Sequence, residues 1–272
     1  MREVLPGSST VLPFSPATVA LFIAYMYDHK YASSTVSTYV SAIGYSHKLS
    51  GLPDPSKAFY VLQMLKGYGK IGTRKDNRLP ITLPILHRII TASSQLFDSP
   101  FDTSQFQAMC LFAFYSFSRI GEITGNTHNT LQIHHISKLL DNSHNVEALK
   151  VTFSHYKHSY NQHPFSLIIS RQPTFCPVQY CLNYFNLRGF TPGPLFIMPD
   201  GSPIQRAVFC NKLKTVLKLC DLDPSRYKGH SFRIGAASHA AERGLSDAQI
   251  RSMGRWKSNA FLKYIRISSV SQ

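Results

Sequence analysis

The segment at residues 67–80, GYGKIGTRKDNRLP, most limits how this chain can fold. It combines glycines, a run of basic residues and a proline, a composition that interrupts regular secondary structure. Apolar residues recur at helical spacing on both sides of it, so each side can bury a core of its own. We therefore expect a helical unit at residues 1–68, a basic linker at residues 69–79 and a larger unit at residues 80–272.

The segment at residues 67–80 also contains Gly67, Gly69 and Gly72 in the spacing of a dinucleotide-binding fingerprint. That fingerprint needs a strand before it and a helix after it. Here a helical pattern precedes it and a proline follows, which argues against a nucleotide site. The segment is better suited to follow a phosphate backbone. The basic residues available for this contact are Lys66, Lys70, Arg74, Lys75 and Arg78.

Three helices are expected in the first unit. Ser15 followed by Pro16 is a typical helix start. Ser34 is placed to cap a second helix that ends near Gly51, and residues 59–69 have a third helical pattern.

The second unit is expected to be mainly α with a small β-sheet. Two apolar segments, residues 84–97 and 103–117, read as buried helices. Alternating segments at 148–159 and 163–170 predict two strands joined by a polar turn, and PLFIM at 194–198 predicts another short strand. Further helices are expected at residues 176–189 and 205–220 and at three places near His230, Ser246 and Ser258; SDAQ at 246–249 is a capping box.

The charge of the chain indicates a polyanionic partner. The 272 residues carry 29 Lys and Arg against 14 Asp and Glu, a formal net charge of +15. This excess favours nucleic acid, whereas a membrane surface is disfavoured because the basic residues are spread over every segment. No apolar run is long enough for a membrane span, and the first residues do not resemble a signal peptide.

The cysteine pattern predicts neither disulfides nor zinc. The five cysteines are an odd number and include no C-x-x-C pair, so we expect reduced thiols in an intracellular compartment. The carboxylates do not gather into a two-metal site, and the histidines show no recurring ligand spacing. The sequence therefore predicts no metal and no cofactor.

Three stretches hold candidate site residues. GHSFRIGAASHAAERG at 229–244 places His230 and Arg233 on one face in the first turn of a helix, where backbone N–H groups favour an anion. FSRIGEIT at 117–124 places Arg119 after a buried helix with Glu122 three residues later. Glu122 is either an ordinary ion-pair partner of Arg119 or orients it toward a phosphate.

The third stretch, MGRWKSNAFLKYIR at 253–266, contains Tyr264 and the single tryptophan, Trp256. A tyrosine in such a place most often packs in a core or at its rim. The basic residues around it indicate a phosphate instead, and they are Arg255, Lys257, Lys263 and Arg266.

Arg119, His230, Arg233, the GRW segment and Tyr264, in this order, resemble the signature of the tyrosine recombinases, the phage integrase superfamily. The sequence motifs at residues 229–238 and 253–266 are similar to those of the eukaryotic branch, the integrases of DIRS-like and Crypton-like mobile elements. The resemblance implies a helical core-binding (SAM-like) DNA-binding domain followed by a catalytic domain of the DNA breaking-rejoining type.

The resemblance also implies roles for the candidate residues. Tyr264 would attack a DNA phosphate and form a 3′-phosphotyrosine, without metal or ATP. Arg119 and Arg233 would bind the phosphate oxygens, His230 would take or guide the phenol proton, and a hairpin lysine, matched here by Lys157, would protonate the leaving 5′-oxygen.

One position departs from the family pattern. The family's His or Trp lies nine residues before the tyrosine, and here that residue is Arg255, followed by Trp256. Trp256 is favoured for the role because its indole N–H can donate to a phosphate oxygen, and Arg255 remains the alternative. Arg255 and Lys257 are otherwise expected to contact DNA.

The implied partner is double-stranded DNA, bound by a homotetramer that is a monomer or dimer without DNA, and the implied location is the nucleus. Two other readings stay open: an integrase-derived DNA-binding protein without strand exchange, and a type IB topoisomerase. All the implied catalytic positions carry competent residues, which favours the recombinase.

Overall fold

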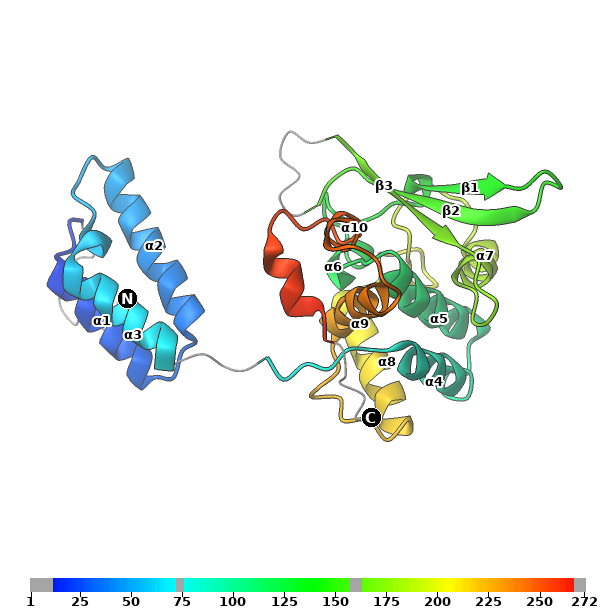
Figure 1. Cartoon of the computed structure of the whole chain (residues 1–272), viewed down its shortest axis with the longest axis horizontal. Helices are drawn as coiled ribbons and strands as arrows, with labels where there is room; N and C mark the ends of the chain where they lie inside the picture. The colour runs from blue at the N-terminus through cyan, green and yellow to red at the C-terminus, as the bar shows by residue number, and fades with distance from the viewer. Residues whose placement is uncertain (1–11, 72–75, 157–162, 267–272) are drawn as a thin grey trace. The chain divides into compact units, whose positions relative to one another are not determined.

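A computed structural model describes residues 12–71, 76–156 and 163–266 of the chain (Figure 1). The chain divides into two compact units, Met1–Asp76 and Asn77–Gln272. The predicted linker is shorter than expected at its start, because a helix continues through residues 69–71. Gly67 and Gly69 lie inside that helix, so these two glycines do not form a nucleotide-binding loop. Gly72, Arg74 and Lys75 lie outside the described residues.

The first unit is a small helical bundle around an apolar core. Its elements are α1 (Pro16–Asp28), α2 (Ser33–Leu49), the 3-10 helix η1 (Pro55–Lys57) and α3 (Phe59–Ile71). Ser15 caps α1 as predicted and accepts a hydrogen bond from the Thr18 backbone N at 3.1 Å. The prediction for Ser34 was wrong: α2 begins at Ser33, its N-cap is Ala32, two residues before Ser34, and no side chain caps it.

The second unit packs helices against a three-stranded antiparallel sheet of order β1-β2-β3. Its helices are α4 (Leu83–Ser93), α5 (Pro100–Tyr115), α6 (Ile120–Ile123), η2 (Ile133–His135), α7 (Pro177–Arg188), α8 (Arg206–Leu219), α9 (Gly229–Glu242), α10 (Asp247–Met253) and η3 (Asn259–Tyr264). Its strands are β1 (Ile136–Leu140), β2 (Val146–Phe153) and β3 (Phe165–Ser170). The capping box predicted at Ser246 is present at the start of α10.

Two strand predictions need correction. β1 was not expected, because its residues are mostly exposed and lack a clear apolar alternation. PLFIM forms no regular strand: the segment makes isolated bridges, Gln132 with Pro194 and Ile197 with Pro203. It is apolar because Leu195 and Phe196 are buried in the core.

The core of the second unit is built around α5. Residues 105–114 of this helix are all buried, and it contacts α4, α7 and α9. The apolar run CLFAFY is therefore a central core helix. Among the described residues, no helix is both long and apolar enough to cross a membrane.

The segment before α4 lies directly against α9. Ile81 N donates to Ser231 O at 3.0 Å, and Leu79 N donates to Arg226 O at 2.8 Å. Gly235 permits this approach, since a Cβ built on it would lie 1.9 Å from the Ile81 carbonyl oxygen. The small residue thus sets the position of α9, the helix that carries His230 and Arg233.

Replacing Gly235 with alanine is expected to destabilise the second unit by about 3 kcal/mol, because the clash is with backbone that cannot move aside. Chemical denaturation measures this. Gly121→Ala is the matched control: it also changes a helical glycine, and an added Cβ there meets nothing within 4 Å. A loss of unfolding free energy below about 1 kcal/mol for Gly235→Ala would contradict the close approach of Gly235 to the Ile81 backbone.

Candidate active site

His230 and Tyr264 meet across 34 residues of sequence. His230 Nε2 lies 2.9 Å from the Tyr264 hydroxyl. His230 is in the first turn of α9 and Tyr264 ends η3, which Figure 1 shows in red beside α9. Ser238 joins the two elements, since its Oγ accepts from Arg266 N at 2.8 Å and contacts Tyr264 O at 3.3 Å. The phenol is thus held against the imidazole.

Arg233 lies near the tyrosine, with its guanidinium carbon 5.9 Å from the centroid of the Tyr264 ring. Its side chain is fully buried, and its two terminal nitrogens donate to the carbonyls of Phe117 and Gly254. The guanidinium stacks on Trp256 at 4.1 Å from the ring centroid, while its Nε has no hydrogen-bond partner. Arg233 therefore places a buried positive charge at the site, with both terminal nitrogens bonded to backbone carbonyls.

Of Arg119, Arg233 and Arg255, Arg119 has the most exposed side chain. Its side chain is 23% exposed, and one terminal nitrogen donates to Glu122 Oε1 at 2.9 Å. The Arg119 backbone N donates to Glu122 Oε2, also at 2.9 Å. Glu122 is therefore an ion-pair partner of Arg119 that also binds its backbone N; that it orients Arg119 toward a phosphate stays a prediction.

Arg255 is buried, which corrects the prediction that it contacts DNA. Its side chain is 1% exposed and donates to Glu122 Oε2 at 2.8 Å. Burial raises the pKa of Glu122, but the charges of Arg255 and Arg119 outweigh burial and hold that pKa below its usual value. Glu122 is thus a carboxylate between two guanidinium groups.

Of the two residues considered for the His/Trp position, Trp256 lies beside the tyrosine. Its ring centroid is 5.1 Å from that of Tyr264 and 6.2 Å from that of Phe261. Gly254 makes room for it, because a Cβ there would lie 1.6 Å from the indole ring. Trp256 therefore packs the tyrosine, while Arg255 turns to the interior.

His230 is surrounded by cations. Burial, together with the charges of Arg78, Arg233, Arg119 and Arg206, lowers its pKa to about 4. A histidine with this pKa is neutral at pH 7, and in the tautomer that carries its proton on Nδ1, Nε2 accepts from the Tyr264 hydroxyl.

The shifted pKa of His230 predicts a loss of stability on acidification. The unfolded chain protonates His230 near the ordinary value of 6.5, whereas the folded chain does so only near 4. The unfolded state binds the extra proton first, so stability is complete above pH 6.5 and falls as the pH drops toward 4. Urea midpoints at pH 7.5 and pH 5.0 measure this loss. Between these two pH values His230→Gln should lose less stability than the natural chain. His128→Gln, at an exposed histidine, should lose as much stability as the natural chain. Equal losses in all three proteins would contradict the lowered pKa of His230.

The remaining predicted site residues are placed as follows. Lys66 is exposed on α3 in the first unit, and Lys257 is exposed between α10 and η3. Lys70 and Arg78 are among the described residues, and the Arg78 carbonyl accepts from Arg266. Lys157, Arg74 and Lys75 lie outside the described residues. In the described part of the chain, no group of three or more His, Cys, Asp or Glu could hold a metal ion.

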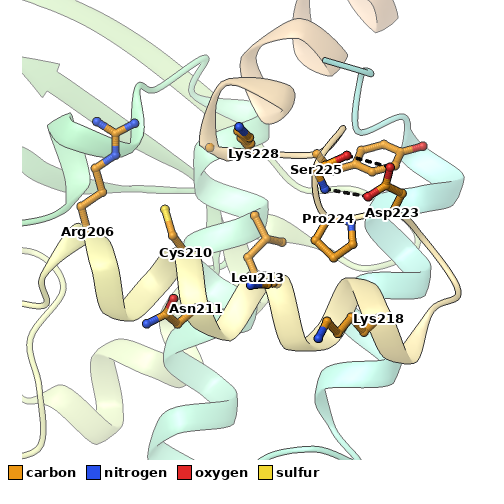
Figure 2. Close-up of a pocket in the computed structure, with 12 residues that line it drawn as sticks. Arg206, Cys210, Asn211, Leu213, Lys218, Asp223, Pro224, Ser225 and Lys228 are labelled. Carbon is orange, nitrogen blue, oxygen red and sulfur yellow. Dashed lines mark hydrogen bonds between the residues drawn. The ribbon is translucent and has the colours of Figure 1, made fainter. Parts of the chain in front are cut away.

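The structure adds a basic hollow that the sequence reading missed. A pocket of about 540 Å³ lies between α8 and the turn that leads into α9 (Figure 2). Ser225 donates to Asp223 across this turn at 2.9 Å and 2.7 Å. The cations lining the pocket are Arg206, Lys214, Lys218 and Lys228. The first three recur at multiples of four residues, so they share one face of α8; this spacing was the available signal.

The comparisons with known proteins find the same fold at low sequence identity. No model of a known protein family and no curated protein matches the sequence. The solved structure of a lambda integrase (75–356) dimer bound to a COC′ core site matches with a TM-score of 0.65 at 13% identity, over 100% of this chain and 86% of that one.

Two further structures agree. The Tn1549 transposon integrase in complex with circular intermediate DNA has a TM-score of 0.62 at 13% identity, over 97% of this chain and 85% of its own. The XerH site-specific recombinase bound to difH has a TM-score of 0.61 at 12% identity, over 94% and 67%. The predicted fold class, mainly α with a small sheet, is confirmed, and it is the fold of these recombinases and integrases.

Proposed function

We propose that this chain is a site-specific DNA recombinase of the tyrosine recombinase type, which cuts and rejoins DNA through a covalent 3′-phosphotyrosine without metal or ATP. The observation that carries the proposal is the 2.9 Å contact between His230 Nε2 and the Tyr264 hydroxyl, where the charges of Arg119 and Arg233 act on His230. The three solved structures of the same fold are of DNA complexes, which supports DNA as the substrate.

The first chemical step uses the Tyr264 oxygen as nucleophile. It attacks the phosphorus while its proton passes to the neutral His230, and the bond from phosphorus to the 5′-oxygen breaks. Lys157, assigned by resemblance, supplies the proton that the leaving 5′-oxygen needs. The ester energy is kept in the tyrosine link, so the 5′-hydroxyl of another strand can reverse the step and join new partners.

The arginines stabilise the negative charge that develops in this step. Negative charge builds on the phosphate oxygens in the transition state, and preorganised cations lower its energy more than water does. The Arg119 side chain is 23% exposed, which leaves it accessible for direct contact with a phosphate. Burial, with the charges of Arg119 and Arg255, lowers the pKa of Arg233 to about 9, so Arg233 still carries its charge at neutral pH.

The biological setting belongs to the same proposal. The sequence motifs at residues 229–238 and 253–266 favour a mobile-element integrase of the DIRS-like or Crypton-like kind. It would act in the nucleus, as a tetramer on two duplexes. The N-terminal unit, residues 1–68, would act as the core-binding domain, with residues 80–272 as the catalytic domain.

The test is to trap the covalent intermediate. The full chain is incubated with a pool of randomised duplexes that each carry a nick, in EDTA, so that the short 5′-hydroxyl fragment diffuses away after cleavage. We expect an adduct that survives denaturation, with the nucleotide mapped by peptide mass to Tyr264. Salt-sensitive binding with no adduct from any member of the pool would instead favour the DNA-binding protein without strand exchange.

The basic face of α8 is expected to contact phosphate. Lys214 and Lys218 line the hollow beside α9 and are exposed. Replacing both with alanine should lower the slope of log affinity against log salt by about 2, close to 0.9 for each phosphate contact, on every DNA sequence alike. Titrations at several salt concentrations measure the slope. Lys138→Ala, on the edge strand β1, is the control; an unchanged slope in the double variant would remove α8 from the DNA surface.

A further inference from the structure

The side-chain hydrogen bonds of Arg255 all go to one short segment of the chain. Its terminal nitrogens donate to Ser116 O at 3.3 Å, Phe117 O at 3.4 Å and Glu122 Oε2 at 2.8 Å. Its guanidinium lies 3.7 Å from the centroid of the Phe153 ring. Arg255 therefore holds residues 116–122, the turn from α5 into α6 on which Arg119 lies.

Glu122 connects Arg255 to Arg119 through hydrogen bonds to both residues. The same oxygen, Oε2, accepts from Arg255 and from the Arg119 backbone N, while Oε1 accepts from the Arg119 side chain. A carboxylate bonded on both oxygens has little freedom to rotate. Removing Arg255 would release one side of that carboxylate, and both bonds that orient Arg119 would loosen.

The backbone at both ends of this connection is in an unfavourable conformation. Phe117 has φ 52° and Arg255 has φ 54°, in the left-handed region that residues other than glycine seldom adopt. The Phe117 carbonyl accepts from Arg233 as well as from Arg255, which holds the turn in place. Such a conformation persists where surrounding contacts enforce it and tends to occur at functional sites.

The positive φ also separates the roles of two neighbours. The chain turns at Arg255, so this side chain reaches inward to Glu122 while Trp256 stacks beside Tyr264. A buried ion pair gives little net stability compared with a well-packed apolar pair, so its main consequence here is geometric.

We propose that Arg255 is a positioning residue, which fixes Arg119 for the scissile phosphate through Glu122 and the carbonyls of Ser116 and Phe117. Its catalytic consequence rests on the proposed function. Arg255 itself does not touch DNA.

The first arm of the test separates chemistry from binding. In Arg255→Met the single-turnover cleavage rate is expected to fall about 100-fold, the size of effect that a small misplacement of a catalytic group produces, while DNA affinity changes less than about 3-fold. Arg255→Lys keeps the charge without the planar fork and should fall between Arg255→Met and the natural chain. Arg251→Met, at an exposed arginine of α10, is the control. A loss confined to DNA affinity would overturn the proposal.

A modified substrate distinguishes positioning from general damage. A methylphosphonate at the mapped cleavage site removes one charged oxygen, so the transition state depends less on Arg119. The 100-fold defect of Arg255→Met should then shrink to below about 10-fold. A defect of unchanged size on this substrate would mean that Arg255 acts by some route other than Arg119.

The second arm needs no cleavage. NMR follows the Arg119 backbone amide and its Nε–H signal, assigned with Arg119→Lys. Both signals should shift in Arg255→Met, and the amide, freed from Glu122, should exchange with water at least about 10-fold faster. Unchanged Arg119 signals would overturn the positioning role even if the natural chain cleaves DNA. A natural chain that forms no adduct on any DNA would overturn the proposed function, and the NMR result would then decide the positioning role alone.

Discussion

Replacing Tyr264 with phenylalanine is expected to abolish the covalent protein–DNA adduct. Phenylalanine keeps the ring that packs on Trp256 but lacks the oxygen that lies 2.9 Å from His230 Nε2. Without it there is no nucleophile at this place, and the rate of adduct formation should fall by at least about 10⁴-fold. The measurement is the single-turnover rate with nicked DNA in EDTA.

The variant should fold as the natural chain does, because Tyr264 is only partly buried and phenylalanine keeps its ring. Under the proposed function it should still bind DNA, since the hydroxyl is needed for cleavage. Phenylalanine at Tyr45, an exposed tyrosine of the first unit, is the matched control and should leave the rate unchanged. An adduct that persists in Tyr264→Phe would assign the chemistry to another residue. A variant that loses DNA binding as well would point to a structural role for the tyrosine.

Replacing Glu122 with glutamine is expected to lower the free energy of unfolding of the second unit by about 3–5 kcal/mol. The carboxylate is 5% exposed and is bonded to two arginines, one of which, Arg255, is 1% exposed. The amide leaves a buried guanidinium without a counter-charge, which costs more than the ion pair itself contributed. For a unit of this size the midpoint of thermal unfolding should drop by about 10 °C.

The comparison is with Glu147→Gln, which removes an exposed carboxylate from β2 and should change stability by less than about 0.5 kcal/mol. Chemical denaturation of both variants gives the two values side by side. A loss below about 1 kcal/mol in Glu122→Gln would mean that water or a rearranged partner reaches Arg255, and that the buried pair is weaker than its 2.8 Å distance implies.

The helices could largely be predicted because their patterns are local. Ser15 with Pro16 and the capping box at Ser246 act on the nearest turns of backbone, and the structure has both as expected. The short range of these patterns also explains the strand predictions that were missed or wrong. β1 and PLFIM are decided by what lies next to them in space, an edge pairing for one and burial without a partner strand for the other.

The candidate site divides in the same way. The order of Arg119, His230, Arg233 and Tyr264 could be read along the chain, because each stands in a short recognisable string. The roles of Arg255 and Trp256 could not, since they are neighbours in sequence and one turns inward while the other packs on the tyrosine. Only the positive φ at Arg255 and the space above Gly254 separate them.

By itself, then, the sequence determined the helical character, the candidate nucleophile and the basic charge that favours DNA. These follow from spacing of a few residues and from composition. The tertiary structure decided which cations are exposed and which are buried: Arg119 at the surface, Arg233 and Arg255 inside, and a basic face of α8 beside α9. Burial depends on contacts between segments more than 100 residues apart, such as Arg233 with Phe117 and Arg255 with Glu122, and no local pattern encodes them.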